Sequence, residues 1–290
     1  MKHNPAALIC ISAILLYTSC NSAFHQPAPQ TITAILGAFD EEVIPLEEQL
    51  QDKHEQTIEG MKFVTGKLKE RKVVIAWTGI GKVNAAMTTT LAIEHFRPNE
   101  VIFTGIAGAL NPQLLHGDIV IAEKIAQHDL GIWTETGLEN RGEINPFTGT
   151  RNPIFFPADK RLLKLAERAA EKLDLEKIKT DTGERTPRIV KGTVVTGDVF
   201  VVSTAKRTDL RNRLNADAVE MEGAAVAQIC YQHNIPYLAI RTISDKADEK
   251  ALRDLEKHQK IAANNSAKLT ARIVSLLSDS QTTEYNKNVK

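Results

Sequence analysis

Cysteine is scarce in this 290-residue chain, which contains only Cys10, Cys20 and Cys230. Three cysteines are too few for a disulfide scaffold, and no Cys-x-x-Cys pair or His/Cys cluster has the spacing of a metal site. An excess of one charge is also missing, because 36 Lys and Arg residues balance 36 Asp and Glu residues. No net field would draw the chain to nucleic acid, so we expect neither a bound metal nor a nucleic-acid partner.

The N-terminus lacks acidic residues, since residues 1–39 contain no Asp or Glu and one strong base, Lys2. The apolar run from Ala6 to Leu16, interrupted only by Cys10 and Ser12, is shorter than the about 20 residues that a membrane-spanning helix needs. A base followed by a short apolar run is typical of a secretory signal. We therefore expect this segment to direct export.

Small residues precede a cysteine at the end of the run, in Tyr17-Thr18-Ser19-Cys20. This resembles a bacterial lipoprotein signal, although Tyr17 stands where leucine is usual. We expect residues 1–19 to be a signal peptide and residues 20–30, which are polar and contain two prolines, to be a tether. Lipidation of Cys20 would anchor the exported protein in the cell envelope, as its only membrane contact. Cleavage elsewhere, for instance after Ala23, and a retained buried helix are the alternatives.

The remaining chain has ordinary globular composition, with 42% apolar and 25% charged residues. Apolar runs of strand type alternate with helical periodicity, which predicts an α/β fold in one domain, residues 31–280. The expected strands are 31–39, 61–68, 72–78, 101–104, 118–126, 188–195, 218–221 and 237–243, and the expected helices are 41–52, 83–96, 159–174, 204–214, 223–233 and 249–277. Glycines and prolines predict a long loop or insertion at 129–158, and residues 281–290 form a polar tail.

Polar residues and glycines follow several of the expected strands. In α/β sheets, ligands bind beyond the strand ends. The segments concerned are Gly37–Val43, Thr104–Gly108, Gly197–Phe200, Val219–Gly223 and Arg241–Asp245. Taken singly, several have an ordinary explanation: the acidic cluster at 40–42 suits a helix dipole, and Phe200 suits the core. Arg241 and Asp245 suit an ion pair, and Glu220 and Glu222 suit a surface pair.

Taken together and in this order, the segments resemble the 5′-methylthioadenosine/S-adenosylhomocysteine nucleosidases of the nucleoside phosphorylase/nucleosidase superfamily. The resemblance runs from about residue 35 to residue 276 and leaves out 129–158. Besides the first acidic cluster, its motifs are Thr78–Ala86, TGIAGAL at 104–110, HGDIV at 116–120, VTGDVF at 195–200, AVEMEGAA at 218–225 and RTISDKAD at 241–248. It implies a single-domain three-layer sandwich, in which a twisted mixed β-sheet is flanked by helices, and a homodimer.

The reaction that the resemblance implies is hydrolysis of the N-glycosidic bond of methylthioadenosine or S-adenosylhomocysteine to adenine and the free ribose derivative. Adenine leaves readily only when protonated, so the site needs an acid at the purine N7 and a base that activates water. By the family pattern, Asp245 is the acid and Glu42 is the base. Arg241 would lie near Glu222 and the water, where it fixes the charge geometry. This chemistry needs neither a metal nor a cofactor.

The resemblance also assigns the residues that bind the nucleoside. Glu222 and the main chain of Met221 would hold the ribose hydroxyls, and Ser244 would orient Asp245. Phe200 would stack on the purine, and the main chain of Val201 would pair with its edge. The ribose side would be lined by Phe39, Ala107 and Gly108.

Two features depart from the family pattern. Many relatives carry Ser or Thr at the place of Ile106, where a hydroxyl helps to hold the water, and the insertion Gly137–Pro157 lies where the family places a loop over the 5′ substituent. The alternatives are a hydrolase of another adenine nucleoside such as aminodeoxyfutalosine, a purine nucleoside phosphorylase, and a non-catalytic nucleoside-binding surface lipoprotein. The acidic cluster at 40–42 disfavours the phosphorylase, because a phosphate nucleophile needs cationic or N–H donors.

Overall fold

The computed structural model describes residues 31–171, 173–180 and 183–288. The predicted signal peptide 1–19, the lipidation site Cys20 and the tether 20–30 lie outside the described residues.

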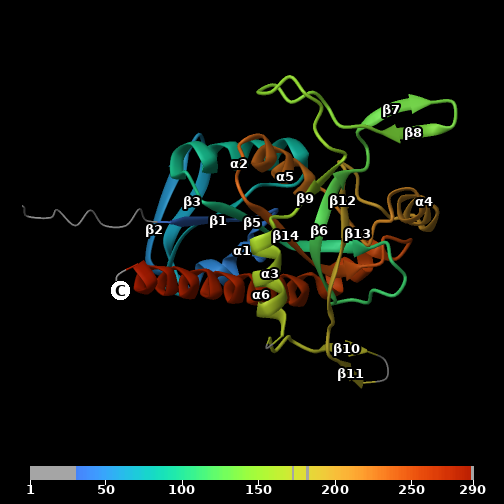
Figure 1. Ribbon diagram of the computed structural model, residues 1–290. Helices are drawn as coiled ribbons and strands as arrows, with labels where there is room; N and C mark the ends of the chain where they lie inside the picture. Colours follow the sequence, from blue (N-terminus) through green and yellow to red (C-terminus); the bar gives the residue numbers. More distant parts are fainter. Residues whose placement is uncertain (1–30, 172, 181–182, 289–290) are drawn as a thin grey trace, which may run out of the picture. The chain divides into compact units, whose positions relative to one another are not determined.

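A mixed β-sheet forms the centre of the molecule (Figure 1). Its neighbouring strands follow the order β13-β12-β6-β14-β5-β1-β4-β3-β2, and β9 pairs with β6. The bounds are β1 Ile32–Gly37, β2 Gln51–Ile58, β3 Met61–Leu68, β4 Arg71–Trp77, β5 Glu100–Ala109, β6 Ile119–Gln127, β9 Phe155–Pro157, β12 Ile189–Thr196, β13 Ala218–Glu220 and β14 Tyr237–Asp245. The last strand, β14, lies inside the sheet, parallel to β5 and antiparallel to β6.

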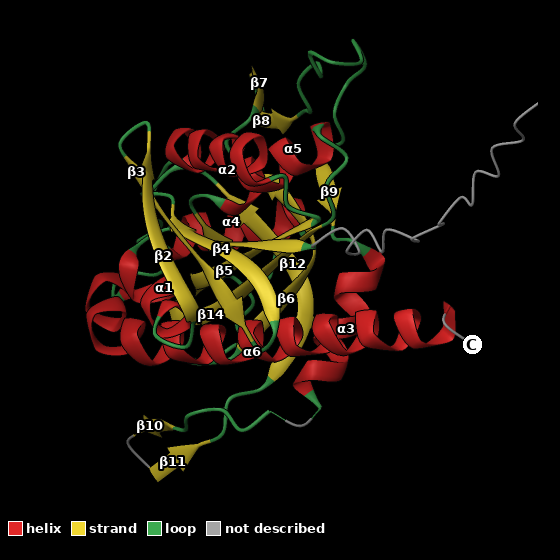
Figure 2. Ribbon diagram, turned by 90° about the vertical axis from the view of Figure 1, so that its left-hand side faces the viewer, coloured by secondary structure: helices red, strands yellow, loops and turns green. Residues whose placement is uncertain are grey.

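Helices cover both faces of the sheet, as the alternation of side chains along β1 shows. Ala34 and Leu36 belong to the same apolar cluster as residues of α2 (Lys82–Phe96) and α5 (Gly223–Gln232). Ile35 points to the other face and packs with α1 (Asp40–Glu47), α3 (Lys160–Ala170) and α6 (Ala251–Asn288). Figure 2 shows these two helical layers on opposite sides of the strands. The predicted three-layer α/β sandwich is therefore confirmed.

The sheet curls back on itself at the end of β5. Gly108 and Ala109 pair antiparallel with β13, which also pairs parallel with β12. Helix α4 (Thr204–Leu214) covers a separate apolar cluster beside this closure through Leu210 and Leu214. The closure brings the carboxyl ends of β1, β5, β13 and β14 close together, because β5 is a neighbour of the other three.

Several elements differ from the expected ones. The first helix ends at Glu47 rather than at residue 52, and β2 follows. All but two of the side chains of β2 are exposed, so the strand carries no apolar alternation and forms through its pairing with β3. Strands β10 (Ile178–Thr180) and β11 (Gly183–Arg185), which pair antiparallel, were not among the expected strands, because they too have no apolar alternation. Helix α6 continues past residue 277 to Asn288, so the expected polar tail 281–290 begins within it.

The segment 129–158, expected as a long loop or insertion, contains regular structure. Strands β7 (Gly131–Thr134) and β8 (Gly137–Asn140) form a hairpin that projects from the body of the molecule in Figure 1. Trp133, on this hairpin, is 78% exposed. The segment then returns to the sheet, where β9 pairs antiparallel with β6.

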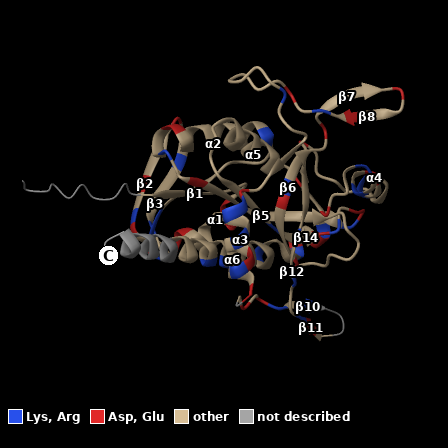
Figure 3. Ribbon diagram, viewed as in Figure 1, with Lys and Arg blue, Asp and Glu red and all other residues tan. Residues whose placement is uncertain are grey.

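Basic and acidic side chains are interspersed over the described part of the chain (Figure 3). Within the same residues, no helix combines the length and the apolar character that crossing a bilayer requires.

Candidate active site

A cavity of about 310 Å³ lies where β1, β5, β13 and β14 end. Its wall contains five carboxylates and, among the described residues that line it, no Lys, Arg or His. The lining residues are Ala38, Phe39, Glu41, Glu42, Ile80, Ile106, Ala107, Gly108, Val199, Phe200, Val201, Val219, Glu220, Met221, Glu222, Ser244, Asp245, Leu255 and Gln259. The structure thus brings together both predicted catalytic carboxylates and all eight predicted substrate-binding residues; Arg241 lies behind the wall.

Glu42 enters the cavity from the first turn of α1, directly after β1. Its carboxylate accepts hydrogen bonds from the main-chain N–H groups of Ala38 (2.5 Å) and Ile106 (2.8 Å). Burial raises the pKa of Glu42 to about 7, against the opposing effects of the Arg241 charge and the N–H donors. A carboxylate with this pKa can accept a proton near neutral pH.

The end of β5 is shaped to hold Glu42. A Cβ atom on Gly105 would lie 2.3 Å from Oε1 of Glu42, so only glycine permits this approach. Ile106 has no hydroxyl that could hold a water molecule. Its main-chain N–H holds the Glu42 carboxylate, and this contact does not depend on the side chain at position 106. The departure at Ile106 therefore leaves the orientation of Glu42 intact.

Asp245, the last residue of β14, is almost completely buried. It accepts hydrogen bonds from the Ser244 hydroxyl (2.9 Å) and from the main-chain N–H of Ala247 (2.8 Å). Burial raises the pKa of Asp245, while these two hydrogen bonds oppose the shift. A Cβ atom on Gly108 would lie 2.7 Å from Oδ1, so this glycine allows the carboxyl to lie against β5. Asp245 has the surroundings that a proton donor needs.

Glu222 immediately precedes α5 and faces the same cavity. Its Oε1 accepts a hydrogen bond from the main-chain N–H of Gly81 (2.8 Å). Burial and the nearby Glu220 carboxylate raise the pKa of Glu222 to about 8. The fixed Oε1 leaves Oε2 available for ligand hydroxyls.

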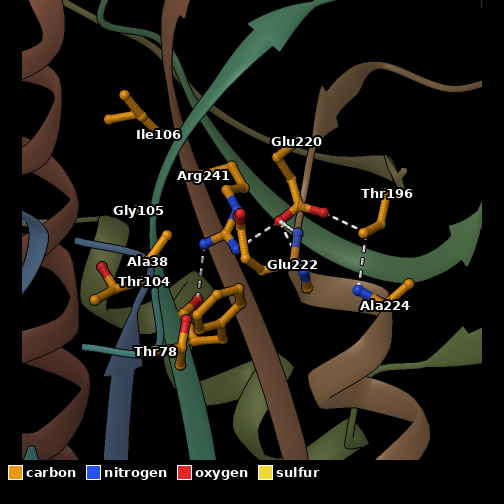
Figure 4. A network of polar contacts seen from close by, with 12 residues as sticks. Ala38, Thr78, Thr104, Gly105, Ile106, Thr196, Glu220, Glu222, Ala224 and Arg241 are labelled. Atoms are coloured by element: carbon orange, nitrogen blue, oxygen red, sulfur yellow. Dashed lines mark hydrogen bonds and ion pairs between the residues drawn. The ribbon is translucent and has the colours of Figure 1, made fainter. Parts of the chain in front are cut away.

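Arg241 lies near Glu222, as expected, because its charge lowers the pKa of Glu222, and it forms an ion pair with Glu220 (Figure 4). Nη2 lies 2.8 Å from Oε2 of Glu220, and the guanidinium carbon lies 4.1 Å from the ring centroid of Phe103. The simpler expectation of an ion pair with Asp245 is wrong, because residues four apart on a strand are about 13 Å apart. Arg241 still acts electrostatically on Glu42 and Glu222, whose pKa values its charge lowers.

Glu220 is the residue of this network that sequence reasoning missed. It accepts hydrogen bonds from the Thr196 hydroxyl and from the main-chain N–H groups of Glu222 (3.1 Å) and Gly223 (2.7 Å). In Figure 4, Glu220 lies between Arg241 and Thr196. The spacing of Glu220 and Glu222 could have indicated this role, because side chains two residues apart along a strand point to the same side.

Comparison with known proteins identifies the family. The sequence pattern of the phosphorylase superfamily matches residues 32–275. A 5′-methylthioadenosine/S-adenosylhomocysteine nucleosidase of Psychromonas ingrahamii is 38% identical over 244 residues, which cover 84% of this chain and 98% of that protein.

Two solved structures show the same fold at similar identity. The Neisseria meningitidis nucleosidase of this name, in complex with methylthio-immucillin-A, superposes with a TM-score of 0.72 at 34% identity, covering 84% of this chain and 99% of that one. The futalosine hydrolase of Helicobacter pylori superposes with a TM-score of 0.71 at 30% identity, covering 84% and 97%. The chain therefore belongs to the phosphorylase superfamily and, within it, to the 5′-methylthioadenosine/S-adenosylhomocysteine nucleosidases.

Proposed function

We propose that this protein hydrolyses the N-glycosidic bond of a 5′-modified adenine nucleoside, methylthioadenosine or S-adenosylhomocysteine. One observation carries the proposal: two buried carboxyl groups, Glu42 and Asp245, come from opposite ends of the sequence and face one cavity with raised pKa values. Two carboxyls held in different surroundings are the arrangement by which glycosidases separate an acid from a base.

Each residue has a defined task in this reaction. Protonated Asp245 donates to N7, so adenine departs as a neutral base and the ribose becomes oxocarbenium-like. Glu42 takes a proton from the water that attacks the sugar. Glu222 accepts hydrogen bonds from the ribose hydroxyls and stabilises the cationic sugar, while Phe200 stacks on the purine. Arg241 stays paired with Glu220 and helps to keep Glu42 ionised.

Water, rather than phosphate, is the nucleophile that this cavity favours. The described residues that line it include no Lys, Arg or His, so a phosphate dianion would find no cationic side chain to bind it. We expect the purified protein to release adenine from methylthioadenosine in phosphate-free buffer, at a rate that added phosphate leaves unchanged. Chromatographic measurement of free adenine tests this. No release, or release only with phosphate, would contradict the proposal.

Activity should depend on pH through the carboxyl groups of the site. Glu42 and Glu222 must both be ionised, and their pKa values are about 7 and about 8, so kcat/KM should fall as the pH drops below about 8. Asp245 must be protonated, so kcat/KM should fall again once the pH exceeds the raised pKa of this residue. The profile of kcat/KM between pH 5 and pH 10 should therefore be bell-shaped. A rate that stays constant over this range would exclude the assigned roles.

A second candidate substrate differs only at the 5′ position. This candidate is another adenine nucleoside such as aminodeoxyfutalosine, which the likeness to the Helicobacter pylori futalosine hydrolase supports in part. A panel of 5′-substituted adenosines, compared by kcat/KM for adenine release, separates these candidates. A protein that binds the whole panel without turnover would instead be a nucleoside-binding surface protein.

We also propose that the protein is a homodimer and is lipid-anchored in the cell envelope. The dimer is supported by apolar side chains on α2 near the cavity, where Val83 is 79% and Met87 46% exposed. Sedimentation velocity of the mature protein should give twice the monomer mass.

The anchor is supported by the N-terminal sequence alone, and mass spectrometry should find an acylated Cys20 as the first residue.

A further inference from the structure

Helix α2 begins without a capping side chain of its own. Gly81 precedes it, with a φ of +94°, and its first turn contains no acidic residue. Two carboxylates from distant segments supply what is missing: Glu222 accepts from the Gly81 N–H at 2.8 Å, and Asp198 accepts from the Lys82 N–H at 2.7 Å. Such anions satisfy the free N–H groups and the positive end of the helix dipole.

The side chain of Lys82 closes a ring of contacts at the same place. Its Nζ donates to Asp129 Oδ1 (2.7 Å) and to Gln127 Oε1 (3.0 Å). The other oxygen of Asp129 accepts from the Asp198 N–H at 2.9 Å. Burial opposes ionisation of Asp129, but the Lys82 and Asp198 hydrogen bonds lower its pKa below the ordinary value. We call Lys82, Asp129 and Asp198 the Lys82 clip.

The clip joins two segments that line the cavity, near Ile80 and at Val199–Val201, to Asp129, which lies outside the cavity wall. Asp198 is followed by Val199, Phe200 and Val201, all of which line the cavity. Val199 is 51% and Phe200 40% exposed, so burial alone does not hold this wall in place. On the other side, the residue before Lys82 binds Glu222 directly. Both Val199–Val201 and Glu222 are therefore held by contacts with the first residues of α2, and these contacts fix the distance between them.

We propose that Lys82 and Asp198 are positioning residues that hold Phe200 at a fixed distance from Glu222, so that the purine and the ribose of one nucleoside are bound at the same time. This rests on the proposed function, since it takes Phe200 as the purine platform and Glu222 as the ribose ligand. A site whose two contact groups are already held in place binds more tightly than one that must be ordered on binding, so loosening Phe200 should weaken affinity. A residue that only capped α2 would change the stability of the fold without changing affinity for adenine.

The test compares Lys82→Met, Lys82→Arg and Asp198→Ala by three measurements. These are kcat and KM for methylthioadenosine, the Kd of adenine by calorimetry, and the midpoint of thermal unfolding. We expect Lys82→Met and Asp198→Ala to raise KM and the adenine Kd about 10-fold or more, with a smaller effect on kcat. Lys82→Arg should restore values close to those of the unmodified protein, because arginine still donates to Asp129.

Lys191→Met is the matched control, because Lys191 forms an ion pair of the same length, 2.7 Å, with Glu167, outside the cavity wall. It should leave KM and the adenine Kd unchanged. If Asp198→Ala does not fold, Asp129→Asn weakens the same clip from outside the cavity and should also raise KM. Unchanged adenine affinity in the folded clip variants would overturn the inference and leave the proposed function standing. An unmodified protein that neither binds nor releases adenine would overturn both.

Discussion

Replacing Glu42 by glutamine is expected to lower kcat by about 10²- to 10⁴-fold, the usual contribution of a positioned base. An amide of the same size cannot accept a proton from water. Nucleoside affinity should change less than kcat, because the amide oxygen can still accept from the Ile106 N–H, although the amide nitrogen loses the hydrogen bond from Ala38. Single-turnover adenine release, with binding measured separately by calorimetry, distinguishes the two effects.

Glu41→Gln is the matched control for this experiment. Glu41 lies one residue earlier on the same turn of α1 and also lines the cavity, but its side chain is exposed and Ile106 does not hold it. Activity close to that of the unmodified enzyme is expected. If Glu42→Gln keeps more than about a tenth of the activity, a different group activates the water.

Asp245→Asn is expected to reduce kcat by a similar factor, about 10²- to 10⁴-fold, for a different reason. The asparagine amide can still donate a hydrogen bond to N7, but it cannot deliver a proton there. Adenine would then have to leave as an anion. Adenine release from methylthioadenosine at pH 7 measures the loss, and Asp248→Asn, three residues further along, is the control that should retain activity.

The leaving group separates the roles of the two carboxyls. A 5-methylthioribosyl glycoside of 4-nitrophenol has a leaving group that needs no protonation at a purine nitrogen. Asp245→Asn should therefore cleave this compound at close to the rate of the unmodified enzyme, whereas Glu42→Gln should remain inactive. Equal losses in both variants would show that Asp245 does more than protonate the purine.

Elements with an apolar pattern were predictable from the sequence. Strand β3 and helix α4 have the predicted bounds, since a polar turn at 69–70 ends the strand and the helix buries Leu210 and Leu214, four residues apart. Strand β2 was not predictable, because its exposed side chains resemble those of a solvated helix and only pairing with β3 makes it a strand. An apolar pattern in a sequence indicates which side chains are buried. An element whose side chains are exposed has no such pattern, so it cannot be predicted in this way.

The site was predictable only in part. The resemblance placed Glu42 and Asp245 correctly at strand ends, and the structure brings them to one cavity. It did not indicate that Glu220 is the partner of Arg241, because that contact joins β13 to β14 across the closure of the sheet. The raised pKa of Glu42 was equally hidden, since it arises from burial by segments far apart in the chain.

The central position of β14 has a consequence for how the enzyme is made. Glu42 and Asp245 are about 200 residues apart, and the strand that carries Asp245 is the last of the described strands to leave the ribosome. Because β14 bridges β5 and β6, a nascent chain that stops before residue 237 lacks both Asp245 and the middle of the sheet. The two carboxyl groups can therefore face one cavity only after β14 has been synthesised.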